Sequence, residues 1–363
     1  MSSRAHISCD FHVLDIALRK GGRIISEDDF REVIALKSAT LHGISSKIVG
    51  ANRAMRIAEI IKEMHPGSRV VMGGVHPTFS AAELLAKCRA VDAVMRGEAD
   101  HAIVPLWRWA AGDGELREIP GVTFRDEAGV IVSSEKDLAQ IDLDEHPYPA
   151  HELMARETDP LVPRILTARG CTLRCVFCVS AALFGYKLNS RLAARVADQI
   201  EATRDRFGVE FVCMGDLTFM AHKPTGIAIC EELIRRDLGI WWSTQTTIGR
   251  IDTQSARLMA RSGCVQIGFG VESGSSLIIG QANKNVHIER AGPAGPASRR
   301  SKQTSGPADG SAWSAIMPCP SCQRRPSSKA ADFWHPHRVL EWPIRSIRRP
   351  ERSLASALAE SSP

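Results

Sequence analysis

The sequence predicts an α/β protein in which a doubly wound parallel sheet is followed by a partial (β/α) barrel and a disordered tail. Apolar segments alternate with amphipathic segments in residues 1–135, and the alternation resumes in residues 161–288. This pattern is typical of parallel sheets covered by helices. Residues 289–363 lack the apolar side chains that a core requires, which indicates disorder.

Apolar spacing predicts three strand–helix pairs in residues 1–135. The expected strands are 39–46, 70–75 and 93–95, and the expected helices are 52–64, 80–88 and 102–109. Ser80, with Glu83 three positions later, predicts a capping box at the second helix. A hairpin is expected over residues 121–132, with its turn at 126–129.

An acidic segment with two prolines, residues 141–149, predicts a linker over residues 136–160. In the second domain the expected strands are 164–168, 210–214, 240–244 and 265–271, and the expected helices are 191–207, 225–236 and 253–262. Four such units are too few to close a barrel, so we expect the last strand to leave an exposed edge.

The composition changes abruptly in residues 289–363. Ten of the 19 prolines lie there, and Ala, Gly, Pro, Arg and Ser fill 48 of the 75 positions. GC-rich codons give these residues when they are read out of register, so we expect a shifted reading frame after residue 285, where a helix and a fifth strand should follow. Translating the same DNA in the other two frames tests this. A native basic tail that binds RNA or membrane is the alternative.

Charge and composition exclude several classes of function. Lys and Arg exceed Asp and Glu by 46 to 41, but residues 1–288 hold 34 basic and 35 acidic residues, so no nucleic-acid partner is expected. No uncharged apolar stretch reaches 18 residues, and the N-terminus lacks the apolar centre of a secretory signal. We therefore expect no membrane span, a cytoplasmic location and reduced cysteines.

Cys171, Cys175 and Cys178 form a C-x3-C-x2-C pattern in a polar segment. Three thiolates at this spacing can bind three irons of one [4Fe–4S] cluster and leave the fourth iron open. Zinc is the competing metal, but structural zinc usually needs four protein ligands, and no fourth Cys or His follows at short range. Three buried thiols without metal are the remaining alternative.

These cysteines, with Phe177 before the third, resemble the motif of the radical S-adenosylmethionine (SAM) superfamily. Upstream, residues 73–78 (GGVHPT) and 96–100 (RGEAD) resemble the subgroup with an N-terminal cobalamin (B12)-binding domain. The resemblance covers residues 12–287. It implies a cluster that reduces SAM to a 5′-deoxyadenosyl radical, followed by methylation or cyclisation at an unactivated carbon.

The resemblance also implies roles for single residues. Phe177 would lie near the SAM adenine, and Gly215 and Asp216 would lie near its amino group. Glu272 and Ser273 would lie along SAM. Gln245 and Arg250 end the third barrel strand, on the face where such barrels bind ligands, although ordinary loop polarity also explains them.

In the first domain, the resemblance places Ser45, Gly73 and Gly74 near the nucleotide tail of cobalamin. Plain turn residues are the alternative at these positions. His76 is either a ligand or part of a His-Pro turn, and His12 begins an incomplete cobalt-ligand motif. Because the resemblance starts near the second strand of the B12 domain, we expect weak or absent cobalamin binding.

Other candidates carry less information. Cys319, Cys322, His335 and His337 suggest a zinc finger, but the histidine spacing is too short. Cys213, Cys230 and Cys264 are expected in the core, as are the tryptophans at 241 and 242.

The leading hypothesis is therefore a radical SAM enzyme with a B12 domain, or a remnant of one, because the resemblance ends after the fourth barrel strand. Its expected cofactors are a [4Fe–4S] cluster, SAM and cobalamin. Its expected partners are a small-molecule substrate and an electron donor such as flavodoxin or ferredoxin. The alternatives are a non-catalytic Fe–S or cobalamin-binding protein and a zinc-binding module with a basic tail.

Overall fold

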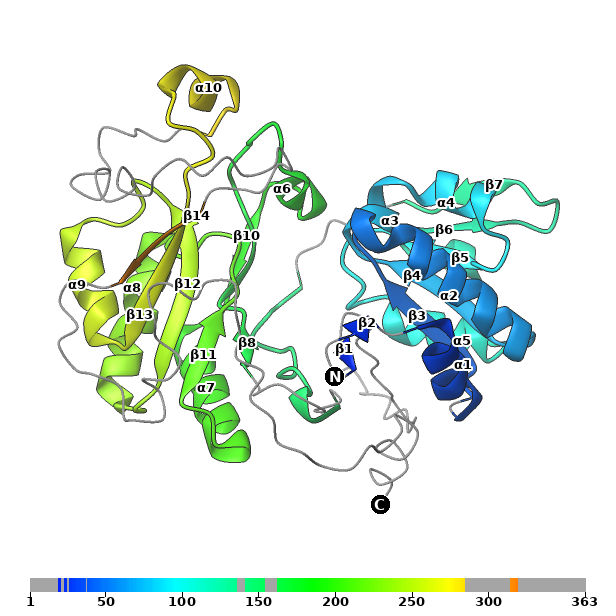
Figure 1. Cartoon of the computed structure of the whole chain (residues 1–363), viewed down its shortest axis with the longest axis horizontal. Helices are drawn as coiled ribbons and strands as arrows, with labels where there is room; N and C mark the ends of the chain where they lie inside the picture. Colours follow the sequence, from blue (N-terminus) through cyan, green and yellow to red (C-terminus); the bar gives the residue numbers. More distant parts are fainter. Residues whose placement is uncertain are drawn as a thin grey trace. The chain divides into compact units, whose positions relative to one another are not determined.

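The computed structural model describes residues 19–20, 23–24, 26–36, 38–135, 141–153, 162–284 and 314–318. These residues form two compact units, and the chain passes from the first to the second between Ile141 and Val162, with Asp142–Glu145 joining the second. Each unit has its own sheet and its own helices (Figure 1). The domain boundaries expected from the sequence stay a prediction.

The first unit contains a five-stranded sheet of order β3-β4-β5-β6-β7. The first three strands are parallel, and the last two add an antiparallel hairpin. The strands are β3 (Leu41–Ser45), β4 (Arg69–Gly73), β5 (Ala93–Met95), β6 (Val122–Arg125) and β7 (Ile131–Ser133). The predicted hairpin is confirmed, and Asp126 N donates to Val130 O across its turn at 2.9 Å.

Helices cover both faces of this sheet. They are α1 (Glu27–Leu36), α2 (Ala51–Met64), α3 (Val75–Phe79), α4 (Ala81–Lys87) and α5 (Ile103–Ala110), with the 3-10 turns η1 (Ile48–Gly50), η2 (Leu116–Glu118) and η3 (His151–Leu153). Val70 and Met72 of β4 pack in a core with α1, α2 and α4, whereas Val71 packs in a second core with α5. Because successive side chains of a strand point to opposite faces, the predicted doubly wound α/β sheet is confirmed.

The start of α4 differs from the sequence prediction. Ser80 is the N-cap residue, but its side chain caps no backbone amide. Its hydroxyl instead lies 3.5 Å from His76 Nδ1, and Glu83 pairs with Lys87 at 2.6 Å. The predicted capping box is therefore wrong, because the short helix α3 precedes α4 directly and supplies a different partner for Ser80.

The second unit contains four parallel strands in the order β13-β12-β11-β8, with β14 added antiparallel at the β13 edge. The strands are β8 (Arg164–Ile165), β11 (Phe211–Met214), β12 (Trp241–Thr247), β13 (Cys264–Gly270) and β14 (Ser314–Pro318). Alternating β and α segments thus give the expected parallel sheet of a partial barrel.

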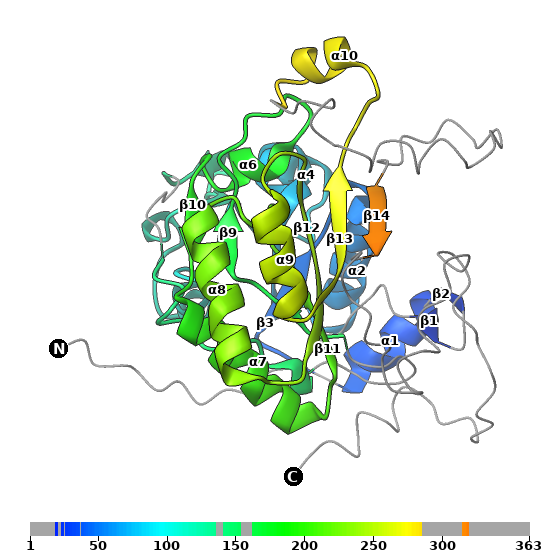
Figure 2. The same cartoon turned by 90° about the vertical axis from the view of Figure 1, so that its left-hand side faces the viewer.

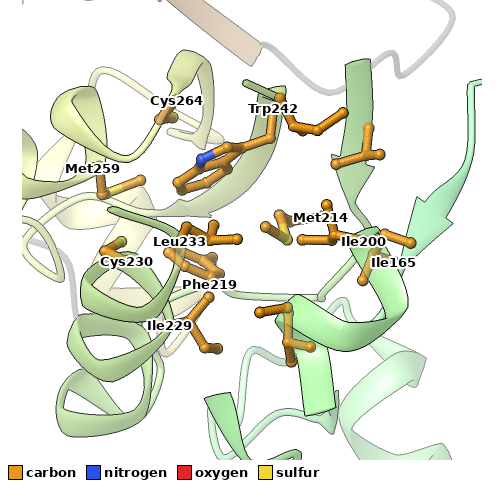
Figure 3. Close-up of a cluster of buried hydrophobic side chains, with 14 of the residues drawn as sticks. Ile165, Ile200, Met214, Phe219, Ile229, Cys230, Leu233, Trp242, Met259 and Cys264 are labelled. Carbon is orange, nitrogen blue, oxygen red and sulfur yellow. The ribbon is translucent and has the colours of Figure 1, made fainter. Parts of the chain in front are cut away.

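Three long helices lie over one face of this sheet: α7 (Ala193–Phe207), α8 (Lys223–Arg236) and α9 (Thr253–Arg261) (Figure 2). Their apolar side chains pack on alternate residues of the strands, including Ile165, Met214 and Trp242 (Figure 3). Trp242 is fully buried and its indole donates to Ser262 O at 2.9 Å. The expectation that this tryptophan is a core residue is confirmed.

The predicted strand 164–168 is broken in the structure. β8 ends at Ile165, and a separate strand β9 (Ala168–Gly170) pairs antiparallel with β10 (Leu188–Ser190). The break occurs because the backbone amides of Thr167 and Ala168 bond to the Asp216 side chain rather than to a neighbouring strand. The segment that carries the three cysteines and the helix α6 (Val179–Leu183) together form the connection between the two strands of this hairpin.

The edge of β13 also differs from expectation. Residues Ser314–Pro318 form β14, which pairs antiparallel with β13 from Gln266 to Gly270. The prediction of an exposed edge is therefore wrong over these five residues. The rest of the expected tail, including the zinc-finger candidates, lies outside the described residues.

Candidate functional site

The three predicted cysteines lie on one segment between β9 and α6, residues 171–178, which we call the cysteine loop. Cys171 is buried, Cys175 and Cys178 are half-buried, and all three are free thiols. Gly170 fixes the start of the loop: its φ is +92°, and a Cβ there would lie 2.1 Å from Lys187 O. Only glycine tolerates both the conformation and this close approach of the Lys187 backbone, just before β10.

The thiols have different neighbours. Leu173 N donates to Cys171 Sγ at 3.5 Å, and the same sulfur lies 3.7 Å from Thr218 Oγ1. Burial raises the pKa of the Cys175 thiol, the Lys284 charge opposes this shift, and the other two thiols add to it.

Three free thiols on one loop are a suitable donor set for an Fe–S cluster, because each thiolate binds its own iron.

Asp216 follows β11 and lies at the carboxyl end of the sheet. Its side chain accepts hydrogen bonds from Thr167 N at 2.7 Å, from Ala168 N at 3.1 Å and from the Thr167 hydroxyl. Burial raises the pKa of this carboxyl to about 6, and the hydrogen bonds counteract the shift. Asp216 thus connects the end of β11 to the segment that leads into the cysteine loop.

Two other predicted residues are placed beside Asp216. Gln245 of β12 donates through Nε2 to Asp216 O at 3.0 Å. Gly215 lies so close to Arg164 that a Cβ would come within 2.4 Å of its side chain. Arg250 lies further along and donates to Ala221 O at 3.4 Å.

Glu272 and Ser273 follow β13, as the sequence analysis expects. Glu272 has a left-handed backbone (φ +61°) and forms an ion pair with Lys284, whose side chain is only 6% exposed. The sequence analysis missed Lys284, because its partners lie far away along the chain. The ammonium lies 5.7 Å from the ring centre of Phe177, whereas Phe177 itself is 53% exposed.

In the first unit, the ends of β3 and β4 bring Ser45, Gly73 and Gly74 together. Ser46 N donates to Gly73 O at 3.0 Å. Gly74 has φ +97°, and a Cβ there would lie 2.8 Å from Ser45 Oγ. The predicted residues thus meet at the carboxyl edge of the sheet, where α/β proteins of this type bind ligands.

Two residues that the sequence analysis missed lie at the same edge. The Thr78 hydroxyl donates to Gly74 O at 2.8 Å and accepts from Gly97 N at 3.0 Å, which connects β4 to the segment after β5. The Ser46 hydroxyl is buried and has no hydrogen-bond partner among the described residues. An unpaired buried hydroxyl beside a glycine turn fits a site that a polar ligand completes. His12 lies outside the described residues.

Fold and site together define a protein of two modules, with a candidate ligand edge in the first and three free thiols on the cysteine loop in the second. Comparison with known families gives the same class: residues 6–106 match the B12 binding domain, and residues 165–291 match the radical SAM superfamily. The chain belongs to the radical SAM proteins that carry a B12-binding domain.

The relatives with similar sequences are named either as methyltransferases or as cyclases. An uncharacterized methyltransferase of Pyrococcus horikoshii is 28% identical over 262 residues, which is 71% of this chain and 57% of the relative. The anaerobic magnesium-protoporphyrin IX monomethyl ester cyclase of Rubrivivax gelatinosus is 28% identical over 278 residues, which is 73% of this chain and 50% of the relative. The chain thus spans about half the length of these relatives.

Solved structures share the fold. The cobalamin-dependent SAM radical enzyme OxsB, with aqua-cobalamin and SAM bound, gives a TM-score of 0.61 at 19% identity and covers 73% of this chain and 40% of its own. The methyltransferase TsrM from Kitasatospora setae, with cobalamin and a [4Fe–4S] cluster bound, gives a TM-score of 0.59 at 18% identity. The match covers 69% of this chain and 53% of the TsrM chain. At these identities the likenesses show that the fold is shared.

Proposed function

We propose that this chain binds a [4Fe–4S] cluster through Cys171, Cys175 and Cys178 and uses it to cleave SAM. The observation that carries the proposal is the set of three free thiols on one loop, of which Cys171 lies 3.7 Å from the hydroxyl of Thr218, a residue that follows β11. When bound and reduced, such a cluster supplies the electron that breaks a carbon–sulfur bond of SAM and so makes a radical that can remove hydrogen from unactivated carbon.

Residues around the cysteine loop would hold SAM. Phe177 offers an exposed ring for the adenine. Gly215, after β11, lets the chain pass close to the Arg164 side chain beside the proposed SAM site. Asp216 and Gln245 bond to each other through the Asp216 carbonyl, so they would fix the floor of the site rather than move during the reaction. Glu272 and Ser273 would line the site along the end of β13.

We further propose that the first unit binds cobalamin at Ser45, Gly73 and Gly74. The glycine turn allows close approach of a ligand, and the unpaired Ser46 hydroxyl would gain a partner. With both cofactors, the activity that fits best is methyl transfer to an unactivated carbon of a small molecule, or cyclisation of such a substrate. The names of the relatives support both reactions.

The partners follow from the chemistry. A low-potential electron donor such as flavodoxin or ferredoxin would reduce the cluster. We propose a reducing compartment such as the cytoplasm, because every cysteine among the described residues is a free thiol. None of the described helices combines the length and apolarity that crossing a bilayer requires.

Anaerobic reconstitution of the full chain tests this proposal. We expect about four irons and four sulfides per chain, and 5′-deoxyadenosine from SAM once a reductant is added. Bound iron without 5′-deoxyadenosine would favour the non-catalytic alternative. One zinc and no sulfide would overturn the proposal.

A further inference from the structure

We propose that Asn283 and Lys284, at the end of α10 (Ser276–Gln281), are positioning residues that hold the cysteine loop in its cluster-binding conformation. The inference rests on the proposed function. It concerns a segment, residues 282–284, that we call the clamp. The clamp contacts the cysteine loop although it lies more than 100 residues further along the chain.

Two hydrogen bonds of the clamp bracket Cys175. Asn283 Nδ2 donates to the carbonyl oxygen of Arg174 at 3.0 Å, and Val176 N donates to the carbonyl oxygen of Ala282 at 3.1 Å. Arg174 and Val176 are the neighbours of Cys175 on either side. The backbone that carries the middle thiol is therefore fixed from both directions by the clamp.

A third contact reaches the residue before Cys178. Lys284 Nζ lies 5.7 Å from the ring centre of Phe177, within the range of a cation–π interaction. The ammonium is held there by its ion pair with Glu272 and by close approach to Gly270, where a Cβ would lie 2.7 Å from Nζ. A buried cation with one carboxylate partner has few other positions available, so it fixes the end of the clamp.

The loop needs such support because little regular structure holds it. Within the loop, Cys178 N donates to Cys175 O at 3.1 Å, and the Arg174 guanidinium lies 4.5 Å from the ring centre of Tyr186. Metal affinity depends strongly on outer residues that orient the ligands. The clamp is the part of the described chain that contacts the loop on both sides of Cys175.

Two variants remove separate parts of the clamp. Asn283 adopts the left-handed conformation (φ +50°), so Asn283→Gly keeps the backbone and removes only the amide donor. Lys284→Met removes the charge, and the double variant Glu272→Gln/Lys284→Met does so without leaving an unpaired carboxylate. Lys62→Met is the matched control, because Lys62 pairs with the partly buried Asp92 at 2.7 Å in the other unit.

The first measurement is deuterium uptake of residues 171–178 in the full-length apoprotein, with residues 193–207 of α7 as internal reference. In Asn283→Gly and in the double variant, the backbone amides of the loop should take up deuterium roughly fivefold faster than in wild type, as expected for loss of a hydrogen bond. Uptake in α7 should stay unchanged, and Lys62→Met should match wild type in the loop.

The second measurement is iron release to a chelator after anaerobic reconstitution, together with the electron paramagnetic resonance spectrum of the reduced cluster. The clamp variants should release iron roughly tenfold faster and give a broadened spectrum. Wild-type exchange and release in Asn283→Gly would overturn the inference, as would an equal effect of Lys62→Met. If wild type takes up no iron, the proposed function is wrong, and exchange in the apoprotein still decides whether the clamp orders the loop.

Discussion

Cys171, Cys175 and Cys178 share one loop but differ in exposure and partners, and Cys213 on β11 provides a natural comparison. Cys213 is also a half-buried free thiol, but its strand pairs with β8 and β12 on either side. At the scale of single residues, the question is therefore which sulfurs bind iron and which only fill space.

Replacing any one of the three loop cysteines by Ala should abolish most of the cluster, because each thiolate binds a separate iron. Iron content and charge-transfer absorption after anaerobic reconstitution measure this loss. Cys213→Ala should retain the wild-type iron content. An equal loss in Cys213→Ala would contradict the assignment of the ligands.

Asp216 should make the stability of the protein depend on pH. Burial raises its pKa to about 6 in the folded protein, from 3.8 as the ordinary value. Between these values the folded state keeps a proton that the unfolded state has lost, so the free energy of unfolding falls as pH rises from about 4 to about 6, by about 2–3 kcal/mol at most. Above pH 6 both states are ionised and the dependence ends.

Urea unfolding of wild type and Asp216→Asn at pH 4, 5, 6 and 7 measures this effect. Asn keeps an oxygen that can accept from Thr167 N and Ala168 N, but it does not titrate. The free energy of unfolding of wild type should therefore fall relative to that of the variant up to about pH 6. A difference that stays constant from pH 4 to pH 7 would contradict the raised pKa.

At the scale of elements, the β9–β10 hairpin sets the start of the cysteine loop. Gly170→Ala should lower the free energy of unfolding by about 1–3 kcal/mol from the left-handed backbone alone. The added Cβ also meets Lys187 O at 2.1 Å, so the loss should exceed that value. Denaturant unfolding measures the loss, and iron uptake should fall as the loop start shifts.

Gly208→Ala is the matched control for this prediction. Gly208 ends α7 with φ +63°, and no atom lies within 4 Å of the position that a methyl group there would take. It should therefore show only the conformational cost, about 1–2 kcal/mol. Equal losses in the two variants would mean that the hairpin can move away from residue 170.

At the scale of the whole molecule, the first unit should bind cobalamin weakly but specifically. Among the described residues β3 pairs with β4 alone, so the strand that carries Ser45 is held on one side. Titration with hydroxocobalamin followed by gel filtration should show partial retention of the corrinoid. Gly74→Val should remove it, because a side chain there meets Ser45 and Ser46. Stoichiometric retention by wild type would contradict weak binding, and retention by the variant would contradict this site.

The sequence predicted most strands and long helices of both units because their apolar periods are regular. It missed β10 because Leu188–Ser190 is short and polar, and it missed β14 because Ser314–Pro318 lies in a segment poor in apolar residues. The spacing alone identified the three cysteines as candidate ligands, and their role stays a prediction. The contact between Asn283 and Arg174 was not, because a single hydrogen bond between distant residues leaves no periodic pattern.

The clamp has a consequence for synthesis on the ribosome. The cysteine loop is made 109 residues before Asn283, which donates to Arg174. At a synthesis rate of 5–20 residues per second, roughly 5 to 20 seconds pass between synthesis of the loop and synthesis of the clamp. During that time the thiols are open to oxidants and to the wrong metal, so we expect correct cluster insertion to follow release of residue 284. Nascent chains stalled before residue 282 should therefore react faster with an alkylating reagent at Cys175 than chains stalled well beyond it, and equal rates would contradict this order of events.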